Sequence, residues 1–470
     1  MAASREHTTN RIFWDPGLRC SIVTLNNVAE YHVENFGCRA SRSDGEAIAA
    51  DLRHRGLSPA KDFTRAHVVV VNTCSVTADA DSGARAFIRR VHRHNPQAKI
   101  VVTGCYAQRA PEELAALNGV GAVIGNSHKS LVAGSILEPS GFVPLAKLVN
   151  AVPVLVDENF AHTDLAALPF AEDGGQTRPN LKVQDGCANR CSFCIIPETR
   201  GPSRSVSLES CLNSVERFAA QGGQELVLSG INMGRWGRDL TPAQRFVDLV
   251  AAILEETALP RLRLSSIEPM DWTPELLALF AAYSGRLARH AHLPLQSGSD
   301  TILRRMYRRY RPWHYAEKLH EIRSLLPDAA IGADVMVGFP GETDALFQES
   351  YDFILTQPLT YLHLFTFSAR PDTPAAALHR LQPVPAHVVE QRMKTLHALA
   401  RQKNLAFRQS FLGRELSVVT LKGNHSTLTP ALSDNFIKVE VETIYPPNRT
   451  MRVQATRLTE TGLCAEPLPQ

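Results

Sequence analysis

Three cysteines, Cys187, Cys191 and Cys194, restrict the fold of this 470-residue chain more than any other feature. Three residues separate the first pair and two separate the second. In a loop, this spacing turns the sulfur atoms to one concave side, where they can bind three irons of an iron-sulfur cube and leave the fourth open. The alternatives are a zinc knuckle or reactive thiols, but no second CxxC or His pair follows nearby. The spacing therefore predicts a cluster with one open iron.

The composition is that of a globular protein of several domains. Hydrophobic residues make up 44% of the chain and charged residues 21%, and 470 residues imply two or three domains. The nine cysteines are an odd number and follow no secretory segment, so we expect no disulfide framework and a cytoplasmic location. We find no transmembrane run, and a net charge of +3 permits a nucleic-acid partner without requiring one.

The first α/β region is predicted over residues 29–137, after a polar extension over 1–28. Strand patterns at 31–38, 67–71 and 99–106 alternate with helical stretches. The second of these patterns is an unbroken apolar run, which suits a strand buried on both faces. This alternation predicts a Rossmann-like or flavodoxin-like parallel sheet covered by helices.

Three further cysteines, Cys38, Cys74 and Cys105, each stand at the end of one of these strands. The carboxyl ends of neighbouring parallel strands converge on one crevice, where ligands bind. A lone cysteine is usually a small buried apolar residue. Three at equivalent strand ends favour a second cluster.

A linker is predicted over 138–178, followed by a second α/β region over 179–409. About six β/α units follow one another there, fewer than the eight of a closed barrel, so we expect a partial (β/α)6 barrel. Its C-terminal rim should carry the cysteine loop and five polar residues, namely Ser229, Ser265, Glu268, Gln296 and Asp334.

Residues 410–470 alternate apolar and polar side chains between short turns, which predicts a small five-stranded β-barrel. Such barrels bind nucleic acid in some proteins and serve as structural caps in others. Upstream, basic and aromatic residues interleave over 304–313. This stretch is either a solvated helix face or a surface that grips RNA through Arg304, Arg305, Arg308 and Arg309, and its position after the Gln296 loop favours RNA.

Several motifs together resemble the radical S-adenosylmethionine methylthiotransferases, from about residue 30 to the C-terminus. They are the cysteine triplet with the following residues 195–205, Asn72-Thr73-Cys74, Thr103-Gly104-Cys105, His292 to Asp300, and Gly338 to Thr343. The C-terminal β domain is similar to the TRAM module. The resemblance departs from the family pattern at Ser41, Asp44 and Asp372, none of which is a predicted ligand.

The resemblance implies two 4Fe-4S clusters. One is held by the cysteine triplet and binds S-adenosylmethionine, with the five polar rim residues as the cofactor-binding site. The other is held by Cys38, Cys74 and Cys105 and handles the sulfur. A second S-adenosylmethionine supplies the methyl group. The resemblance also implies a one-electron reductant of ferredoxin or flavodoxin type, and a sulfur donor.

Three motifs favour the branch that acts on N6-threonylcarbamoyladenosine beside the tRNA anticodon, so the anticodon stem-loop is the expected partner. Two of these motifs, Asn72 to Thr77 and Gly230-Ile231-Asn232, are similar to that branch, and the third, Gln296-Ser297-Gly298-Ser299, differs from the motif expected for the ribosomal-protein enzyme. The alternatives are isopentenyl-modified adenosine in tRNA, a ribosomal-protein aspartate, or an iron-sulfur RNA-binding sensor without turnover.

Overall fold

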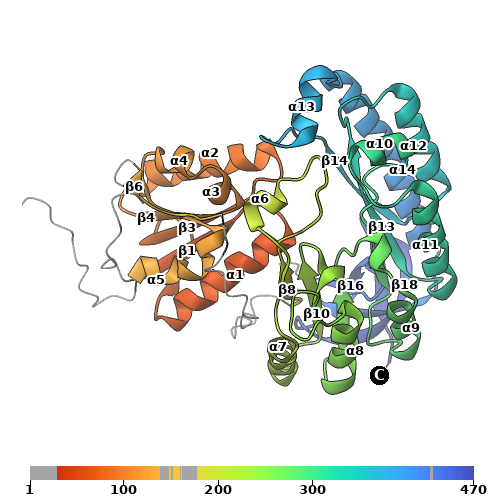
Figure 1. Ribbon diagram of the computed structural model, residues 1–470. Coiled ribbons are helices and arrows are strands. Elements are labelled where there is room, and N and C mark those ends of the chain that lie inside the picture. The colour runs from red at the N-terminus through yellow and green to blue at the C-terminus, as the bar shows by residue number, and fades with distance from the viewer. Residues whose placement is uncertain are drawn as a thin grey trace, which may run out of the picture.

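The computed structural model describes residues 29–137, 148–149, 152–158, 160, 177–423 and 427–469. The predicted extension over 1–28 lies outside these residues. The chain forms an N-terminal sheet unit, a central partial barrel and a small C-terminal barrel (Figure 1). Within the described segments, each helix is too short or too polar to cross a membrane.

The N-terminal unit is a mostly parallel seven-stranded sheet in the order β2-β1-β3-β4-β5-β7-β6. The first five strands have the flavodoxin-like order, which confirms the predicted fold class. The elements are β1 Glu30–Asn35, α1 Arg39–His54, β2 Ser58–Pro59, β3 Val68–Thr73, α2 Ala78–His94, β4 Lys99–Gly104, α3 Cys105–Arg109, α4 Pro111–Ala115, β5 Val120–Gly125, η1 Asn126–Leu131, α5 Val132–Leu137, β6 Leu148–Val149 and β7 Val152–Leu155.

The valine run of β3 forms a strand because both of its faces are buried. Val69 and Val71 pack into one core with side chains of α2 and α4, whereas Val68 and Val70 pack into another with α1 and α5. Successive side chains of a strand point to opposite faces, so a continuous apolar run suits a sheet covered on both sides.

Part of the stretch predicted as a linker belongs to this sheet. Strand β7 pairs in parallel with β5, and β6 pairs antiparallel with β7. These strands are only four and two residues long, and the proline within β7 obscures the strand pattern.

The central unit has six parallel strands, which confirms the predicted partial barrel. They form two sheets, β8-β10-β11 with the short β9 at the edge, and β12-β13-β14. A bridge between Leu262 and Leu287 joins the two groups. The elements are β8 Asn180–Asp185, α6 Ile196–Arg200, β9 Arg204–Ser205, α7 Leu208–Ala220, β10 Glu225–Gly230, η3 Met233–Arg235, α8 Phe246–Glu256, β11 Arg261–Leu264, η4 Pro269–Asp271, α9 Pro274–Ala282, β12 His290–His292, α10 Asp300–Arg305, α11 Pro312–Leu325, β13 Ala330–Val337, α12 Asp344–Thr356, β14 Tyr361–Thr366, α13 Pro374–Leu381 and α14 Ala386–Gln409.

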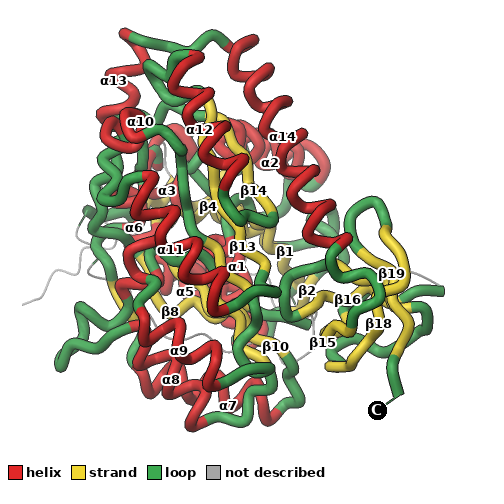
Figure 2. Tube along the Cα trace, turned by 90° about the vertical axis from the view of Figure 1, so that its right-hand side faces the viewer, coloured by secondary structure: helices red, strands yellow, loops and turns green. Residues whose placement is uncertain are grey.

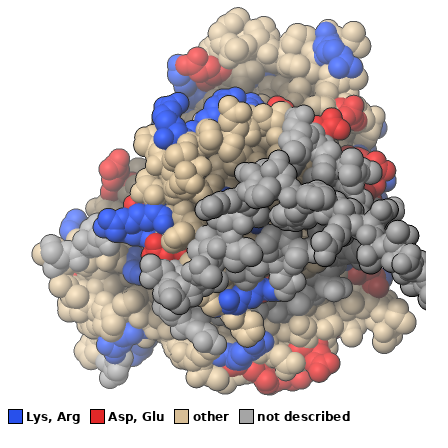
Figure 3. Space-filling view, turned by 90° about the vertical axis from the view of Figure 1, so that its left-hand side faces the viewer, with Lys and Arg blue, Asp and Glu red and all other residues tan. Residues whose placement is uncertain are grey.

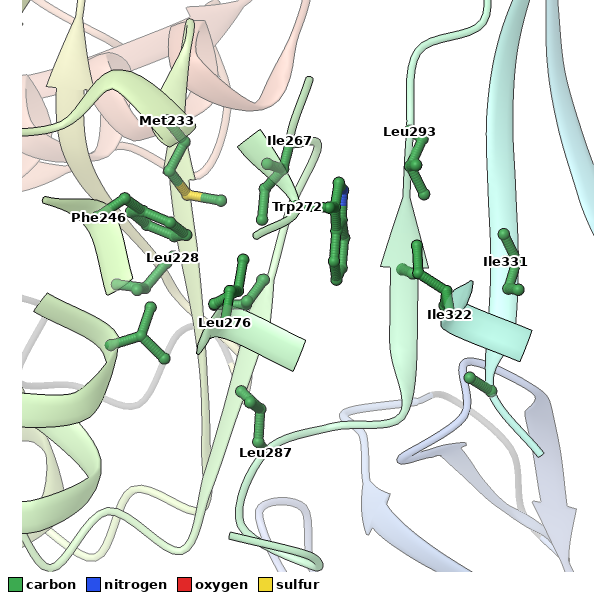
Figure 4. Close-up of a cluster of buried hydrophobic side chains, with 14 of the residues drawn as sticks. Leu228, Met233, Phe246, Ile267, Trp272, Leu276, Leu287, Leu293, Ile322 and Ile331 are labelled. Carbon is green, nitrogen blue, oxygen red and sulfur yellow. The ribbon is translucent and has the colours of Figure 1, made fainter. Parts of the chain in front are cut away.

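The barrel core lies between the strands and the outer helices. Leu228, Phe246, Trp272 and Ile331 are among its buried members (Figure 4). Because side chains alternate along a strand, the residues between these core positions face the concave interior of the barrel. Polar residues of the strands can therefore gather inside.

The C-terminal unit is the predicted closed five-stranded barrel, and it packs at the end of the helix α14 (Figure 2). Its strands are β15 Glu415–Thr420, β16 Thr429–Ser433, β17 Lys438–Val441, β18 Thr450–Leu458 and β19 Leu463–Pro467. Arg263 of the central barrel donates hydrogen bonds to the Ser433 and Asp434 carbonyls at 2.9 and 3.0 Å. Arg289 forms an ion pair with Asp434 at 2.6 Å. These contacts fix the small barrel against the base of the central one.

Candidate functional site

Cys38, Cys74 and Cys105 meet at one edge of the N-terminal sheet. They follow β1, β3 and β4, which are adjacent and in register at Asn35, Asn72 and Thr103. Burial, together with the neighbouring thiols of Cys105 and Cys38, raises the pKa of Cys74 to about 12. A metal must displace that proton, so binding here releases protons.

The surroundings of this N-terminal triad fit a bulky group held by three sulfurs. Gly37 adopts a φ of 108°, and a Cβ there would lie 2.3 Å from the Cys74 Cβ. The Asn126 side chain donates hydrogen bonds to the Cys105 sulfur at 3.4 Å and to the Thr199 carbonyl at 2.7 Å, while its Oδ1 is buried without a hydrogen-bond partner. Three thiols of one edge, with an amide donor beside them, are a donor set suited to an iron-sulfur cluster.

The loop of Cys187, Cys191 and Cys194 follows β8 at the rim of the barrel. The Asn189 amide and the Asn232 side chain donate hydrogen bonds to the Cys187 sulfur at 3.4 and 3.5 Å. Burial raises the pKa of Cys194 to about 12. Hydrogen bonds to thiolates orient cluster ligands and tune a bound cluster, so these residues also fit.

Arg308 belongs to this loop region and not to the exposed face on which the sequence placed it. Its side chain is only 5% exposed. It donates a hydrogen bond to the Cys191 sulfur at 3.2 Å, bonds the Tyr310 hydroxyl at 3.1 Å and forms an ion pair with Glu268. The pattern of alternating arginines and aromatics could not show that one arginine turns inward.

The other three arginines predicted to bind RNA lie nearer to solvent. Arg304 is exposed and pairs with Asp300 at 2.8 Å, and Arg309 is exposed as well. Arg305 is half-buried and donates to the Gly341 carbonyl at 2.9 Å. Their contact with RNA stays a prediction.

The polar rim residues differ in what they offer a ligand. The hydroxyls of Ser229 and Ser265 are buried and donate to the Leu181 carbonyl and the Met233 sulfur. Gln296 has a φ of 69°, and its side-chain oxygen is buried without a hydrogen-bond partner. The remaining two, Glu268 and Asp334, contact Arg308 and a pair of histidines. Their part in cofactor binding remains a prediction.

A buried ion network joins the two cysteine sites, and sequence reasoning did not find it. Arg200 lies six residues after Cys194 and donates to Asp185 at 2.9 Å within its own unit and to Asp44 at 3.0 Å across the interface. Lys129 pairs with Asp44 at 2.6 Å. Burial alone would raise the pKa of Asp44, but Lys129, Lys182 and Arg200 lower it well below its usual range.

A second set of contacts between the same units is centred on Asp81. This carboxylate accepts hydrogen bonds from Ser75 at 3.0 Å, from Arg109 at 3.0 Å and from Arg370 of the central unit at 2.7 Å. Ser75 directly follows Cys74. Two buried ionic contacts therefore hold the N-terminal triad in a defined place relative to the barrel.

Family models match two parts of the chain. Residues 30–125 match "Uncharacterized protein family UPF0004", and residues 181–354 match the radical SAM superfamily. The first match covers the N-terminal triad and the second covers the cysteine loop of the barrel.

Curated relatives match nearly the whole chain. The threonylcarbamoyladenosine tRNA methylthiotransferase MtaB of Aquifex aeolicus is 34% identical over 89% of this chain and 98% of its own length. The MtaB protein of Bacillus subtilis is also 34% identical, over 86% of this chain and 88% of its own. The chain belongs to the radical S-adenosylmethionine methylthiotransferase family.

Another relative of this methylthiotransferase is the tRNA-2-methylthio-N(6)-dimethylallyladenosine synthase of Acidothermus cellulolyticus. It is 33% identical over 84% of this chain and 78% of its own length. Among solved structures, the radical S-adenosylmethionine methyltransferase TsrM of Kitasatospora setae matches with a TM-score of 0.54 and 16% identity. This match covers 74% of each chain and shows a shared fold.

Family membership implies a 4Fe-4S cluster and S-adenosylmethionine, and makes this protein an enzyme. The barrel loop with Cys187, Cys191 and Cys194 is the set of residues that fits that cluster.

Proposed function

We propose that this enzyme converts N6-threonylcarbamoyladenosine beside the tRNA anticodon to its 2-methylthio derivative, with a second 4Fe-4S cluster on Cys38, Cys74 and Cys105. The observation that carries the two-cluster part is the convergence of these three thiols at the adjacent ends of β1, β3 and β4. The Arg200 network holds this sheet edge in place against the barrel unit. The choice of substrate rests on the Asn72 to Thr77 and Gly230-Ile231-Asn232 motifs, and on the MtaB relatives.

Cys187, Cys191 and Cys194 would hold the barrel cluster, which together with S-adenosylmethionine would supply the radical chemistry that activates a C-H bond. The residues of the chain orient the cysteine ligands and enclose the site. Asn232 and Arg308 donate hydrogen bonds to the sulfurs of Cys187 and Cys191, which fixes their direction. Cys187, Cys191 and Cys194 are all half-buried, which limits the access of water to these ligands.

The tRNA contact surface follows from the position of the rim. Figure 3 shows lysines and arginines interspersed with acidic residues on the visible part of the face of the N-terminal unit. That visible surface has no field of a single sign. We place the anticodon contact at the exposed Arg304 and Arg309 near the rim, and we expect the small C-terminal barrel at the base to contact another part of the tRNA. Because the proposed substrate is tRNA, we expect the reaction to take place in the cytoplasm. It also needs a one-electron reductant of ferredoxin or flavodoxin type and a separate sulfur donor.

Nucleoside mass spectrometry of tRNA from a strain without the gene tests the substrate. We expect loss of 2-methylthio-N6-threonylcarbamoyladenosine and a matching gain of the unmethylthiolated nucleoside. Complementation with Cys211→Ala, which changes a buried thiol of α7 outside both triads, should restore the product, whereas Cys74→Ala should not. Unchanged product in the deletion strain contradicts the proposal.

The same measurement decides on the isopentenyl-modified adenosine, the second candidate. Its support is the 33% identical dimethylallyladenosine synthase. In that case the 2-methylthio derivative of the isopentenyl nucleoside would disappear instead.

A sensor without turnover would yield no 5′-deoxyadenosine from S-adenosylmethionine and dithionite under anaerobic conditions.

A further inference from the structure

A group of metal-ligating side chains lies inside the barrel apart from both cysteine triads. His292 of β12, Asp334 of β13 and His363 of β14 each offer one ligand atom, and these atoms all lie within 4.8 Å of one another. The neighbouring strand residues Ala291, Ala333 and Val335 belong to the core under the outer helices. Side chains alternate along a strand, so the three ligating residues face the concave interior.

The distances match those of a mononuclear metal site. Asp334 Oδ1 lies 3.2 Å from His292 Nε2 and 3.2 Å from His363 Nδ1. Ligands about 2.0–2.1 Å from a tetrahedral zinc ion are about 3.3 Å apart. One carboxylate oxygen therefore already stands at ligand distance from both imidazoles.

The buried imidazole of His292 supplies a second, independent observation. Its side chain is only 6% exposed, and its Nε2 has no hydrogen bond of acceptable geometry although Asp334 is close. The other ring nitrogen, Nδ1, contacts the Ser266 hydroxyl. If Nδ1 carries the proton and donates it to Ser266, a lone pair on Nε2 is left to point at the carboxylate, which is the arrangement of a metal-binding histidine.

The Tyr361 ring forms one side of the site, and His363 lies at its open side. A Cβ at Gly332 would lie 1.9 Å from Tyr361 Cζ, so glycine is what allows the Tyr361 ring to cross β13. That ring lies nearly parallel to His292, with ring centroids 5.9 Å apart and an angle of 12°. His363 is 51% exposed, which leaves the opposite side open to a further ligand.

We propose that His292, Asp334 and His363 bind a single divalent transition-metal ion of the zinc class, with an open coordination position toward the barrel interior. Imidazole with one carboxylate is a ligand set for zinc or ferrous iron, and three protein ligands plus an open position are typical of catalytic metal sites. This site is separate from both cysteine triads and needs no cluster chemistry, although it includes Asp334, one of the five polar rim residues assigned above to the cofactor site.

Cobalt(II) titration of the full-length protein with its clusters reconstituted tests the site, because cobalt gives visible d-d absorption where zinc is silent. We expect one cobalt per chain, displaced by zinc, without thiolate-to-cobalt charge-transfer absorption. His363→Ala and Asp334→Ala should each weaken binding at least about tenfold. His397→Ala, which removes an exposed imidazole on α14, should leave binding unchanged.

Iron content and circular dichroism of each variant, equal to those of the wild type, show that the fold and clusters are intact. Anomalous scattering at the zinc edge from zinc-soaked crystals should then place one ion between the three side chains. Absence of cobalt binding, binding that both variants retain, or binding with thiolate charge-transfer absorption overturns the proposal. These readouts record metal alone, so their failure leaves the proposed methylthiolation untouched.

Discussion

Arg200 is one of the side chains that connect the barrel loop region with the N-terminal triad. Its guanidinium is 1% exposed and bonds Asp185 in its own unit and Asp44 in the other. An arginine stays charged even when buried, so the two carboxylates are needed to offset the cost of removing that charge from water. The residue therefore acts by position, holding α6 against the sheet edge that carries Cys38 and Cys105.

Replacing Arg200 tests this role. Arg200→Met leaves Asp44 and Asp185 short of a partner, so we expect it to lower the free energy of unfolding by about 3–5 kcal/mol. Arg200→Lys keeps a charge but cannot bridge both carboxylates, and should cost less. Arg217→Met, an exposed arginine on α7, should change stability by no more than about 0.5 kcal/mol in the same urea titration. Equal stability of Arg200→Met and Arg217→Met would contradict the role.

Glu225 gives a pH-dependent prediction at the base of the barrel. The ordinary pKa of this carboxyl is 4.5. Burial alone would raise that pKa, but Arg263, Arg178 and Arg261 lower it more strongly, so that the net pKa is about 2. A carboxylate with a lowered pKa adds stability that is complete above pH 4.5 and disappears as the pH falls toward 2. A pKa lowered from 4.5 to about 2 in the folded protein corresponds to roughly 3 kcal/mol of folding stability.

Urea unfolding of cluster-free wild type and Glu225→Gln, followed through the buried Trp236 and Trp272, measures this contribution. The two curves should differ by roughly 3 kcal/mol at pH 7 and approach each other between pH 4.5 and 2. A difference that stays constant over this interval would show that the ionised carboxylate is not its source.

At the scale of the element, the turn from β1 into α1 decides whether the N-terminal triad can form. Gly37 there has a φ of 108° and presses against Cys74, whereas Gly56, after α1, has a φ of 90° with nothing within 4 Å of an added Cβ. Both positions have a positive φ, which favours glycine. Only at Gly37 would an added side chain also clash with a neighbour, the Cys74 side chain.

Gly37→Ala should therefore lose the irons of the N-terminal triad and keep those of the barrel loop. Gly56→Ala is the matched control, because it costs about 1–2 kcal/mol of backbone strain but should retain all irons. Iron and acid-labile sulfide analysis after anaerobic reconstitution makes the comparison. Full iron in Gly37→Ala would show that this turn does not shape the site.

The elements that sequence could predict are those whose signal is local. The apolar run of β3 and the alternation of the C-terminal strands follow from periodicity alone, and both structures are present. The short strand β7 and the inward turn of Arg308 depend on contacts with distant residues. The strand β5 was missed although the Val120–Gly125 run between turns carries a strand signal.

In the candidate site, too, the features with a local sequence signal could be predicted and those that depend on distant contacts could not. The convergence of Cys38, Cys74 and Cys105 could be predicted because strand ends of a parallel sheet share one edge. The Arg200 network could not, because its partners are separated by up to 156 residues. The departure at Asp372 has a visible consequence, since this residue adopts a φ of 62° where the family pattern has glycine.

In the molecule as a whole, two clusters of buried ion pairs tie the N-terminal sheet to the partial barrel. In one, Asp44 pairs with Arg200 and Lys182 of the barrel unit, and in the other, Arg370 pairs with Asp81 at 2.7 Å beside Cys74. At the opposite end, Arg263 and Arg289 fix the small barrel. The chain thus forms one scaffold on which the two thiol triads and the small C-terminal barrel keep a constant relation.

Iron analysis of anaerobically reconstituted wild type and Cys74→Ala distinguishes two cubes of four irons in one chain from a single cube. We expect about eight irons per chain in the wild type and about four in the variant, which should still cleave S-adenosylmethionine but form no methylthiolated product. A wild-type value that stays near four after full reconstitution would contradict the presence of two clusters.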